Sequence, residues 1–192
     1  MWTSLNKKLY LILGVIFLIG ILVGITFVCF ISEESREIIF LNINDFIQSL
    51  NNTNLNNIIN HLAIISILII LSFFVIGIPL EMFFVFYNGF SIGFIISSLT
   101  SIFGIKGFLY SLIYIIITKG IYLFILSIIL ISLIKISKLI IDKYILKKGN
   151  NINSINMYLK KSLVCLGIIF LNDIILYFWG SSLINVFNFL II

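Results

Sequence analysis

The chain contains apolar runs that are too long for the core helices of an ordinary soluble domain. The first covers the 23 residues Leu9–Ile31, and a later one covers the 42 residues Leu62–Phe103. A helix needs roughly 20 consecutive apolar residues to cross the hydrocarbon core of a bilayer. Only 10% of the residues are charged, whereas soluble domains have about a quarter. The sequence predicts an all-α fold, a polytopic membrane helical bundle forming a single integral membrane domain over residues 1–192.

The 42-residue run is too long for one crossing and is interrupted at Gly77-Ile-Pro79-Leu-Glu81. Proline lacks a backbone N–H donor, and an ionised carboxylate is unfavourable in hydrocarbon. We therefore expect a tight hairpin here and a second one at Gly104–Gly107. The expected set is about five transmembrane helices, over residues 9–31, 62–78, 82–103, 108–134 and 162–190.

A polar segment, residues 32–60, separates the first two predicted spans. Apolar residues recur in it at helical spacing: Ile39, Ile43, Phe46, Ile47 and Leu50. This pattern predicts a short amphipathic helix lying on the membrane surface. The Asn-rich stretch 51–57 is expected to be a flexible connection to the second span.

The charges differ in sign between the two sides of the predicted bundle. The segment after the first span holds four acidic residues against Arg36, and residues 135–161 hold seven lysines against Asp142. Because Lys and Arg accumulate in cytoplasmic loops, we expect the N-terminus in the cytoplasm and the C-terminus outside the cell membrane. Glu81 then lies at the inner face and Lys106 at the outer face. The net charge of +5 is explained by lysines near anionic lipids, without nucleic acid.

Two residues of opposite charge fall at matching depth in the fourth and fifth predicted spans. Lys119 lies about 17 Å from the outer end of its span at 1.5 Å per residue, and Asp173 lies equally far from the inner end of its own. Both positions are near the middle of a core roughly 30 Å thick. The sequence predicts an intramembrane ion pair between them. The alternative is that either residue faces a polar, water-filled cavity unpaired.

Small and amide residues indicate close helix contacts. Gly20 and Gly24 share one face of the first span, a pattern that is weak evidence for dimerisation. Gly89 and Gly93 share a face of the third span, with Asn88 beside them. Because an unbonded amide is unfavourable in hydrocarbon, we expect this face to pack against another helix.

No enzyme motif or cofactor-binding motif is evident in the sequence, and a non-enzymatic protein without a cofactor is predicted. His61, the single histidine, has no His or Cys neighbour with which to share a metal, and we expect it to anchor its helix at the outer interface. Cys29 and Cys165 lie inside apolar runs, where cysteine behaves as a small hydrophobic residue.

The order of these motifs resembles the stage II sporulation protein M family. That family shows a Gly-x-Pro hairpin, matched by Gly77 and Pro79, then an apolar stretch, then Asn-Gly with a second glycine four residues on, matched by Asn88, Gly89 and Gly93. The segment 104–111 is similar to the family's next hairpin, and the predicted architecture agrees over the whole chain. The chain departs from the family at Thr118-Lys119, where members often have a proline or a neutral polar group.

The resemblance implies a non-enzymatic membrane scaffold in the engulfment of the forespore. Such a protein anchors and localises septal peptidoglycan hydrolases, the stage II sporulation proteins P and D, in the mother-cell or septal membrane. Possible partner contacts are the predicted outer elements, with Glu37 and Phe46 in the amphipathic segment and Lys106 in the hairpin. The other option is a lateral contact of the face formed by Asn88, Gly89 and Gly93 with a partner's membrane helix, and a homo-oligomer is also possible. The alternative is a small transporter or ion-conducting protein that uses Lys119, Asp173 and Asn88.

Overall fold

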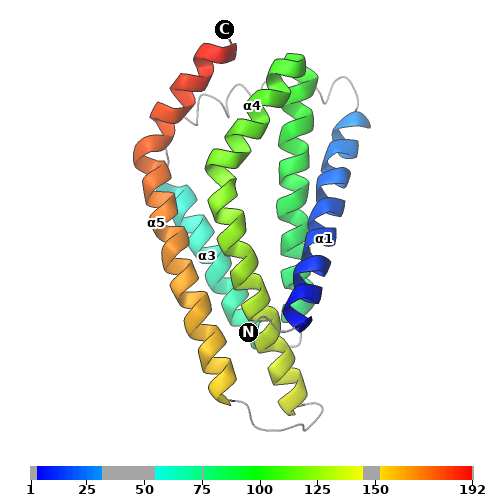
Figure 1. Ribbon diagram of the computed structural model, residues 1–192, viewed down its shortest axis with the longest axis vertical. Helices are drawn as coiled ribbons and strands as arrows, with labels where there is room; N and C mark the ends of the chain where they lie inside the picture. Colours follow the sequence, from blue (N-terminus) through cyan, green and yellow to red (C-terminus); the bar gives the residue numbers. More distant parts are fainter. Residues whose placement is uncertain (1–3, 32–54, 75, 145–151, 192) are drawn as a thin grey trace.

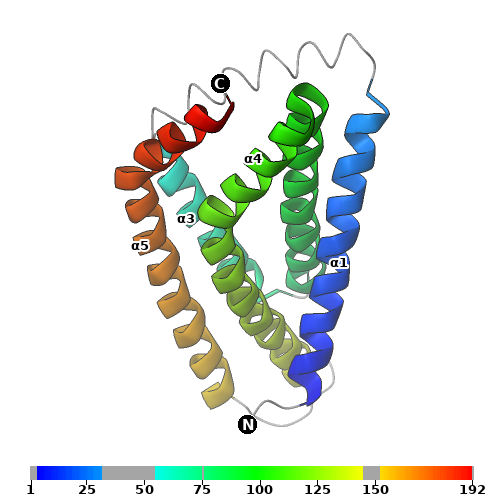
Figure 2. The ribbon, with the colours of Figure 1, turned by 45° about the horizontal axis from the view of Figure 1, so that its top comes forward.

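The computed structural model describes residues 4–31, 55–74, 76–144 and 152–191 of the chain, and side chains within 7–31, 58–74, 76–143 and 153–178 of it. The described part is helical and contains no strand. Its helices are α1 (Ser4–Cys29), α3 (Leu55–Leu71), α4 (Gly77–Tyr144) and α5 (Ile152–Ile191). Figures 1 and 2 show them as an elongated bundle with neighbouring segments running in opposite directions.

Helix α4 reverses direction within its 68 residues. The reversal occurs at Gly104, whose φ of 61° and ψ of −139° are not helical, and both views show the two arms side by side (Figures 1 and 2). Gly107 also requires a glycine, because a Cβ there would overlap the carbonyl oxygen of Leu99 in the other arm. The hairpin expected at Gly104–Gly107 is thus present. Residues 77–103 and 105–144 are two helical arms that meet at Gly104, the residue with non-helical backbone angles.

Helix α1 packs against the first arm of α4 through glycines on both helices. A Cβ added to Gly20 or Gly24 would overlap backbone carbonyl oxygens of α4, and one added to Gly89 or Gly93 would overlap those of α1. Small residues allow this backbone approach, which gains dispersion contacts that larger side chains would prevent. The expected packing face at Gly89 and Gly93 is confirmed, and it is filled by α1 from the same chain.

Aromatic rings extend the same crossing. Phe27 of α1 packs edge-on against Phe90, with ring centroids 5.7 Å apart, and lies 6.3 Å from Phe94. The Ser97 hydroxyl donates to the carbonyl oxygen of Ile25 at 3.4 Å. These contacts continue the interface along one face of each helix, so α1 and the first arm of α4 form a closely packed pair.

The connection between α3 and α4 differs from the predicted hairpin. Helix α3 ends at Leu71, the chain turns at residues 72–74 and 76, and α4 begins at Gly77. Pro79 therefore lies in the first turn of α4. Backbone N–H groups in the first turn have no intrahelical acceptor, so the helix loses no hydrogen bond to the proline. Helix α3 therefore ends before the expected end of the span 62–78, because the proline begins a helix here instead of ending one, and it also begins earlier than expected, at Leu55.

The turn is fixed against the second arm of α4. The Ser137 hydroxyl donates to the carbonyl oxygen of Ser72 at 2.7 Å, and both serines are fully buried. Gly77 lies at the same point, because a Cβ there would come within 2.7 Å of the Ser137 hydroxyl oxygen. The glycine and the hydrogen bond together hold the α3–α4 connection in place.

The second arm of α4 forms the centre of the bundle. Its most deeply buried apolar side chains include Ile129, Leu130, Leu133 and Ile136. Helix α5 adds Ser162, Cys165, Ile169 and Asn172, spaced three or four residues apart on one face. Helix α4 extends to Tyr144 and α5 begins at Ile152, so most of the predicted loop 135–161 is helical.

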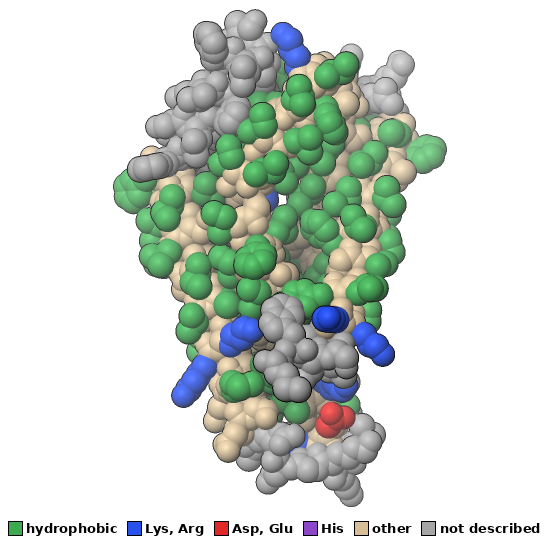
Figure 3. Space-filling view, viewed as in Figure 1, with side chains coloured by type: hydrophobic (Ala, Val, Ile, Leu, Met, Phe, Trp, Pro, Cys, Tyr) green, Lys and Arg blue, Asp and Glu red, His purple; other side chains and the backbone are tan. Residues whose placement is uncertain are grey.

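Three helices of the described part are long and apolar enough to cross a membrane, within Lys7–Cys29, Gly77–Lys143 and Asn153–Phe178. Large apolar side chains are widely exposed on the bundle, among them Leu22 at 62% and Phe178 at 69%. Figure 3 shows them as a broad band, with lysines gathered toward the end drawn at the bottom. Soluble monomers rarely expose such surfaces, which are typical of a membrane helical bundle.

Candidate polar site in the bundle

An imidazole–carboxylate contact joins α3 to α5. The Nδ1 atom of His61 lies 3.2 Å from an Oδ atom of Asp173. The Asp173 side chain is 7% exposed and that of His61 31% exposed. A buried carboxylate requires a hydrogen-bonding partner, and His61 supplies one. The contact is therefore the polar connection between these two helices.

Tyr122 extends this contact into α4. Its ring stacks on the imidazole of His61, with centroids 5.2 Å apart and planes inclined by 22°. The Lys119 ammonium lies 5.4 Å from the centroid of the same ring. Cations within about 6 Å of an aromatic face are attracted by its quadrupole. Lys119, Tyr122, His61 and Asp173 thus form a continuous series of contacts across three helices, which we call the polar cluster.

A cavity of about 240 Å³ lies beside the polar cluster, between α3 and both arms of α4. Its polar lining comes from His61, Lys119, Tyr122, Asn88, Ser91 and Tyr87, and its apolar lining from Ile64, Phe84, Ile92, Ile95 and Leu123. Asp173 does not line the cavity. The cationic group of the cluster therefore faces the cavity, and the anionic group lies outside it.

A second cavity, of about 260 Å³, lies between α1 and the two arms of α4. Its lining is mainly apolar, including Leu13, Phe17 and Leu130, with Ser127 at one side. Asn88 lines both cavities, and its amide nitrogen donates to the carbonyl oxygen of Phe84 in its own helix at 2.8 Å. The amide expected to bond to a neighbouring helix therefore bonds within α4 and borders open space.

The predicted ion pair between Lys119 and Asp173 is replaced by a different arrangement. Within the described side chains, the contact that Asp173 makes at 3.2 Å is with the imidazole of His61, and Lys119 lies against Tyr122. Lys119 remains within electrostatic range of Asp173. The matching depth of the two charges was a sound indication of proximity. It did not account for the imidazole that occupies the direct contact.

His61 was interpreted from the sequence as an interfacial anchor, because the second span was expected to begin at Leu62. Helix α3 instead begins at Leu55, within the stretch expected to be flexible. His61 is therefore about 9 Å into the helix, which brings it toward the level of Asp173. The available signal was the unbroken helical spacing of apolar residues back to Ile58 and Leu55 through the asparagines.

The remaining predicted residues are structural or lie elsewhere. Gly77 and Pro79 begin α4, and Lys106 is exposed just after the Gly104 reversal. Glu37 and Phe46, with the rest of the predicted amphipathic helix, lie outside the described residues. Of the three proposed partner contacts, Lys106 is the one that lies within the described residues.

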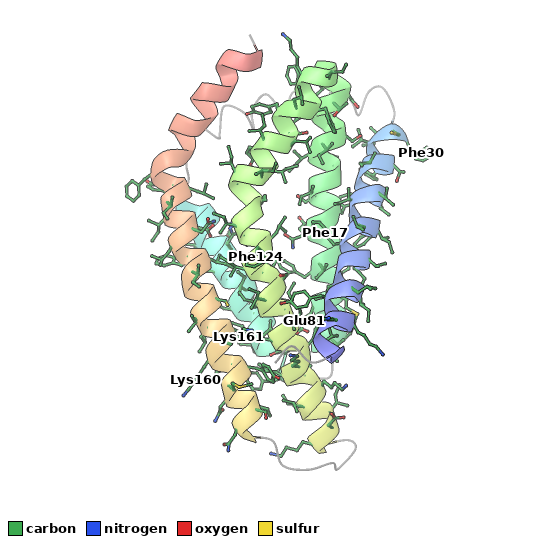
Figure 4. The ribbon with its side chains drawn as sticks, viewed as in Figure 1. Phe17, Phe30, Glu81, Phe124, Lys160 and Lys161 are labelled. Atoms are coloured by element: carbon green, nitrogen blue, oxygen red, sulfur yellow. The ribbon has the colours of Figure 1, made fainter. Side chains whose placement is uncertain are left out.

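Glu81 is the other notable polar side chain of the described part. It is completely buried, near the end of the bundle that holds Lys160 and Lys161 (Figure 4), and neither of its carboxylate oxygens has a hydrogen-bond partner among the described residues. It lies in the second turn of α4 and faces inward. A buried carboxyl group without hydrogen bonds is destabilising, which makes this position informative in mutagenesis.

The class that the fold and the site define is a helical membrane protein with a polar cluster and an adjoining cavity. No family model, curated protein or solved structure matches the chain in the comparisons with known proteins. Among the described residues, no group of three or more His, Cys, Asp or Glu side chains is placed to hold a metal ion.

Proposed function

We propose that the chain is a multi-pass membrane scaffold of the spore-engulfment machinery, which anchors and localises septal peptidoglycan hydrolases of the stage II sporulation P and D types. The observation that supports the proposal is that the glycines on which the family resemblance is based lie at close backbone contacts. Gly77, Gly89, Gly93 and Gly107 are all positions at which another backbone or side chain approaches too closely for a Cβ. Such residues determine architecture, which is the property that a scaffold must preserve.

The proposal includes five membrane crossings, made by α1, α3, the two arms of α4, and α5. These segments alternate in direction in Figures 1 and 2. Lys7 and Lys8 at the start of α1 and Lys160 and Lys161 near the start of α5 then belong to one end of the bundle, and Lys106 to the other. The positive-inside rule makes the lysine-rich end cytoplasmic and puts the end of α5 outside.

The test is deletion of the gene in its native host, followed by imaging of membranes during sporulation. We expect engulfment to stop at a flat or bulging septum and to be restored by the wild-type gene. A Gly93→Leu version should fail to restore it, because the α1–α4 crossing cannot form, whereas Gly167→Leu, at a position with nothing within 4 Å of a Cβ, should restore it. Normal engulfment in the deletion strain, or a host that forms no forespore, would contradict the proposal.

Partner binding gives a second readout. The scaffold should co-purify with the two hydrolases from sporulating cells, and deletion of residues 37–50 should abolish this association if the predicted outer segment makes the contact. Association through a lateral face of α4 at Asn88 and Gly89 is disfavoured, because α1 already covers the glycine face.

Transport or ion conduction is the second candidate, favoured by the cavity beside Lys119 and His61. Ionisable groups in membrane spans often mark a substrate or ion path. The discriminating measurement is flux across vesicles containing the purified protein. A solute-specific flux that is lost on Lys119→Met would favour transport over a scaffold alone.

A further inference from the structure

Lys119 is a cation without a direct carboxylate partner in the described part of the bundle. Asp173 contacts His61 there, and the Lys119 ammonium lies 5.4 Å from the centroid of the Tyr122 ring. Ring contact compensates only part of the loss of water around an ammonium group. The Lys119 charge is therefore available to a further anion.

The cavity next to Lys119 supplies the space and the other donors. Hydroxyl groups of Ser91 and Tyr87 and the amide of Asn88 line it together with Lys119. A volume of about 240 Å³ exceeds that of a few water molecules at about 30 Å³ each. An oxyanion could thus contact one ammonium and several neutral donors at once, which is the usual composition of an anion site.

The charge arrangement selects an anion over a cation. Asp173 is held by His61 and does not line the cavity, so the charged group on the cavity wall that lacks a close partner is the Lys119 ammonium. The neighbouring cavity between α1 and α4 is of similar volume and has no cationic lining residue. The second cavity serves as an internal comparison, because a ligand that bound by cavity size alone would enter both cavities equally well.

We propose that the cavity between α3 and the two arms of α4 binds a small oxyanion group, a carboxylate or a phosphate, with Lys119 as its counter-ion. Tyr87 and Ile64 line the cavity and are also exposed, at 56% and 41%, so the site reaches the outer surface of the bundle. The oxyanion therefore comes either from a soluble anion or from the head group of an anionic lipid. This inference does not rest on the scaffold proposal, and either can fail without the other.

The first arm of the test uses soluble anions. The full chain in neutral detergent is titrated with sodium acetate or inorganic phosphate, and its thermal unfolding midpoint is followed by circular dichroism. A ligand that binds the native state raises the midpoint in a saturable way. We expect this rise in the wild type and in Lys119→Arg, and an affinity at least about tenfold lower in Lys119→Met.

The matched controls separate binding from general salt effects. Lys160→Met makes the same change in net charge at an exposed position and should behave as the wild type. Ser91→Leu fills the cavity without removing a charge and should abolish binding, whereas Ser127→Leu, which fills the second cavity, should not. If Lys119→Met does not fold, the comparison of the two serine variants decides the matter.

The second arm uses lipid. Protein from bilayers of phosphatidylglycerol or phosphatidylcholine is examined by native mass spectrometry for retained lipid. Retention of phosphatidylglycerol by the wild type and not by Lys119→Met identifies a lipid head group as the source, whereas saturable stabilisation by acetate or phosphate identifies a soluble anion. If the wild type, Lys119→Met and Ser91→Leu behave alike in both arms, the cavity holds only water and the proposal is wrong.

Discussion

The imidazole of His61 lies 3.2 Å from the carboxylate of Asp173, and this contact connects α3 with α5 across 112 positions of sequence. Helix α3 has much of its apolar surface exposed, including Ile59 and Ile70, each at 61%. Apolar side chains that face lipid do not determine how a helix is rotated, because lipid is as apolar as they are. The buried residues Ile65 and Leu68 give α3 an inner face, and the polar contact adds a directional restraint on its rotation and height against α5.

Replacing His61 by Leu should destabilise the bundle by about 1–3 kcal/mol, because the Asp173 carboxylate would be left buried without its hydrogen bond. The double variant with Asp173→Leu should recover part of this loss, since both polar groups are then absent. Unfolding in mixed micelles, followed by circular dichroism, measures the effect. The single variant Asp173→Leu completes the comparison. If the loss in the double variant equals the sum of the losses in the two single variants, the contact is not stabilising.

Gly93→Ala should lower stability by about 1–3 kcal/mol, because its methyl group would overlap the carbonyl oxygen of Ile21. Gly167→Ala is the matched control. Nothing lies within 4 Å of a Cβ there, so alanine should raise helix stability by up to about 1 kcal/mol. The two variants are compared in the same micelle unfolding assay. A stabilising Gly93→Ala would mean that α1 does not cross α4 at this point.

Gly104→Ala should destabilise the α4 hairpin by about 1–3 kcal/mol, since φ of 61° with ψ of −139° is a conformation that residues with a Cβ rarely adopt. Space is not the reason, because nothing lies within 4 Å of the added methyl group. Gly120→Ala, also with open space but in regular helix, should be neutral or stabilising. Limited proteolysis at the turn would report the loss of hairpin stability. If the two variants are cleaved equally, the positive φ of Gly104 is not a source of destabilisation.

Glu81→Met should stabilise the protein by about 1–3 kcal/mol, because it removes two buried oxygens that lack hydrogen bonds within the described part and keeps a similar volume. Glu81→Gln keeps a polar group and should gain less. Thermal unfolding of the three proteins in detergent gives the order. A lower midpoint for Glu81→Met than for the wild type would show that the carboxylate has a stabilising partner.

The sequence alone predicted the helical class and much of the helix order. Apolar runs of sufficient length identify membrane helices locally, and the Gly89–Gly93 spacing identified a packing face before its partner was known. The prediction differs from the structure at the C-terminal end of α3, because Pro79 is compatible both with ending a helix and with beginning one. It differs at the start because the asparagines of residues 51–57 were read as a flexible connection, although apolar residues keep helical spacing back to Leu55.

The sequence by itself determined the properties that depend on neighbours along the chain. These are the lengths of the helices, their apolar surfaces, their faces of small residues and the reversal at Gly104. The tertiary structure decided which residues meet. Gly20 and Gly24 pack against α4 of the same chain, and His61 takes the contact with Asp173 that the sequence assigned to Lys119. The physical reason is that depth follows from counting residues, whereas the partner also depends on how each helix is rotated and which helices are adjacent.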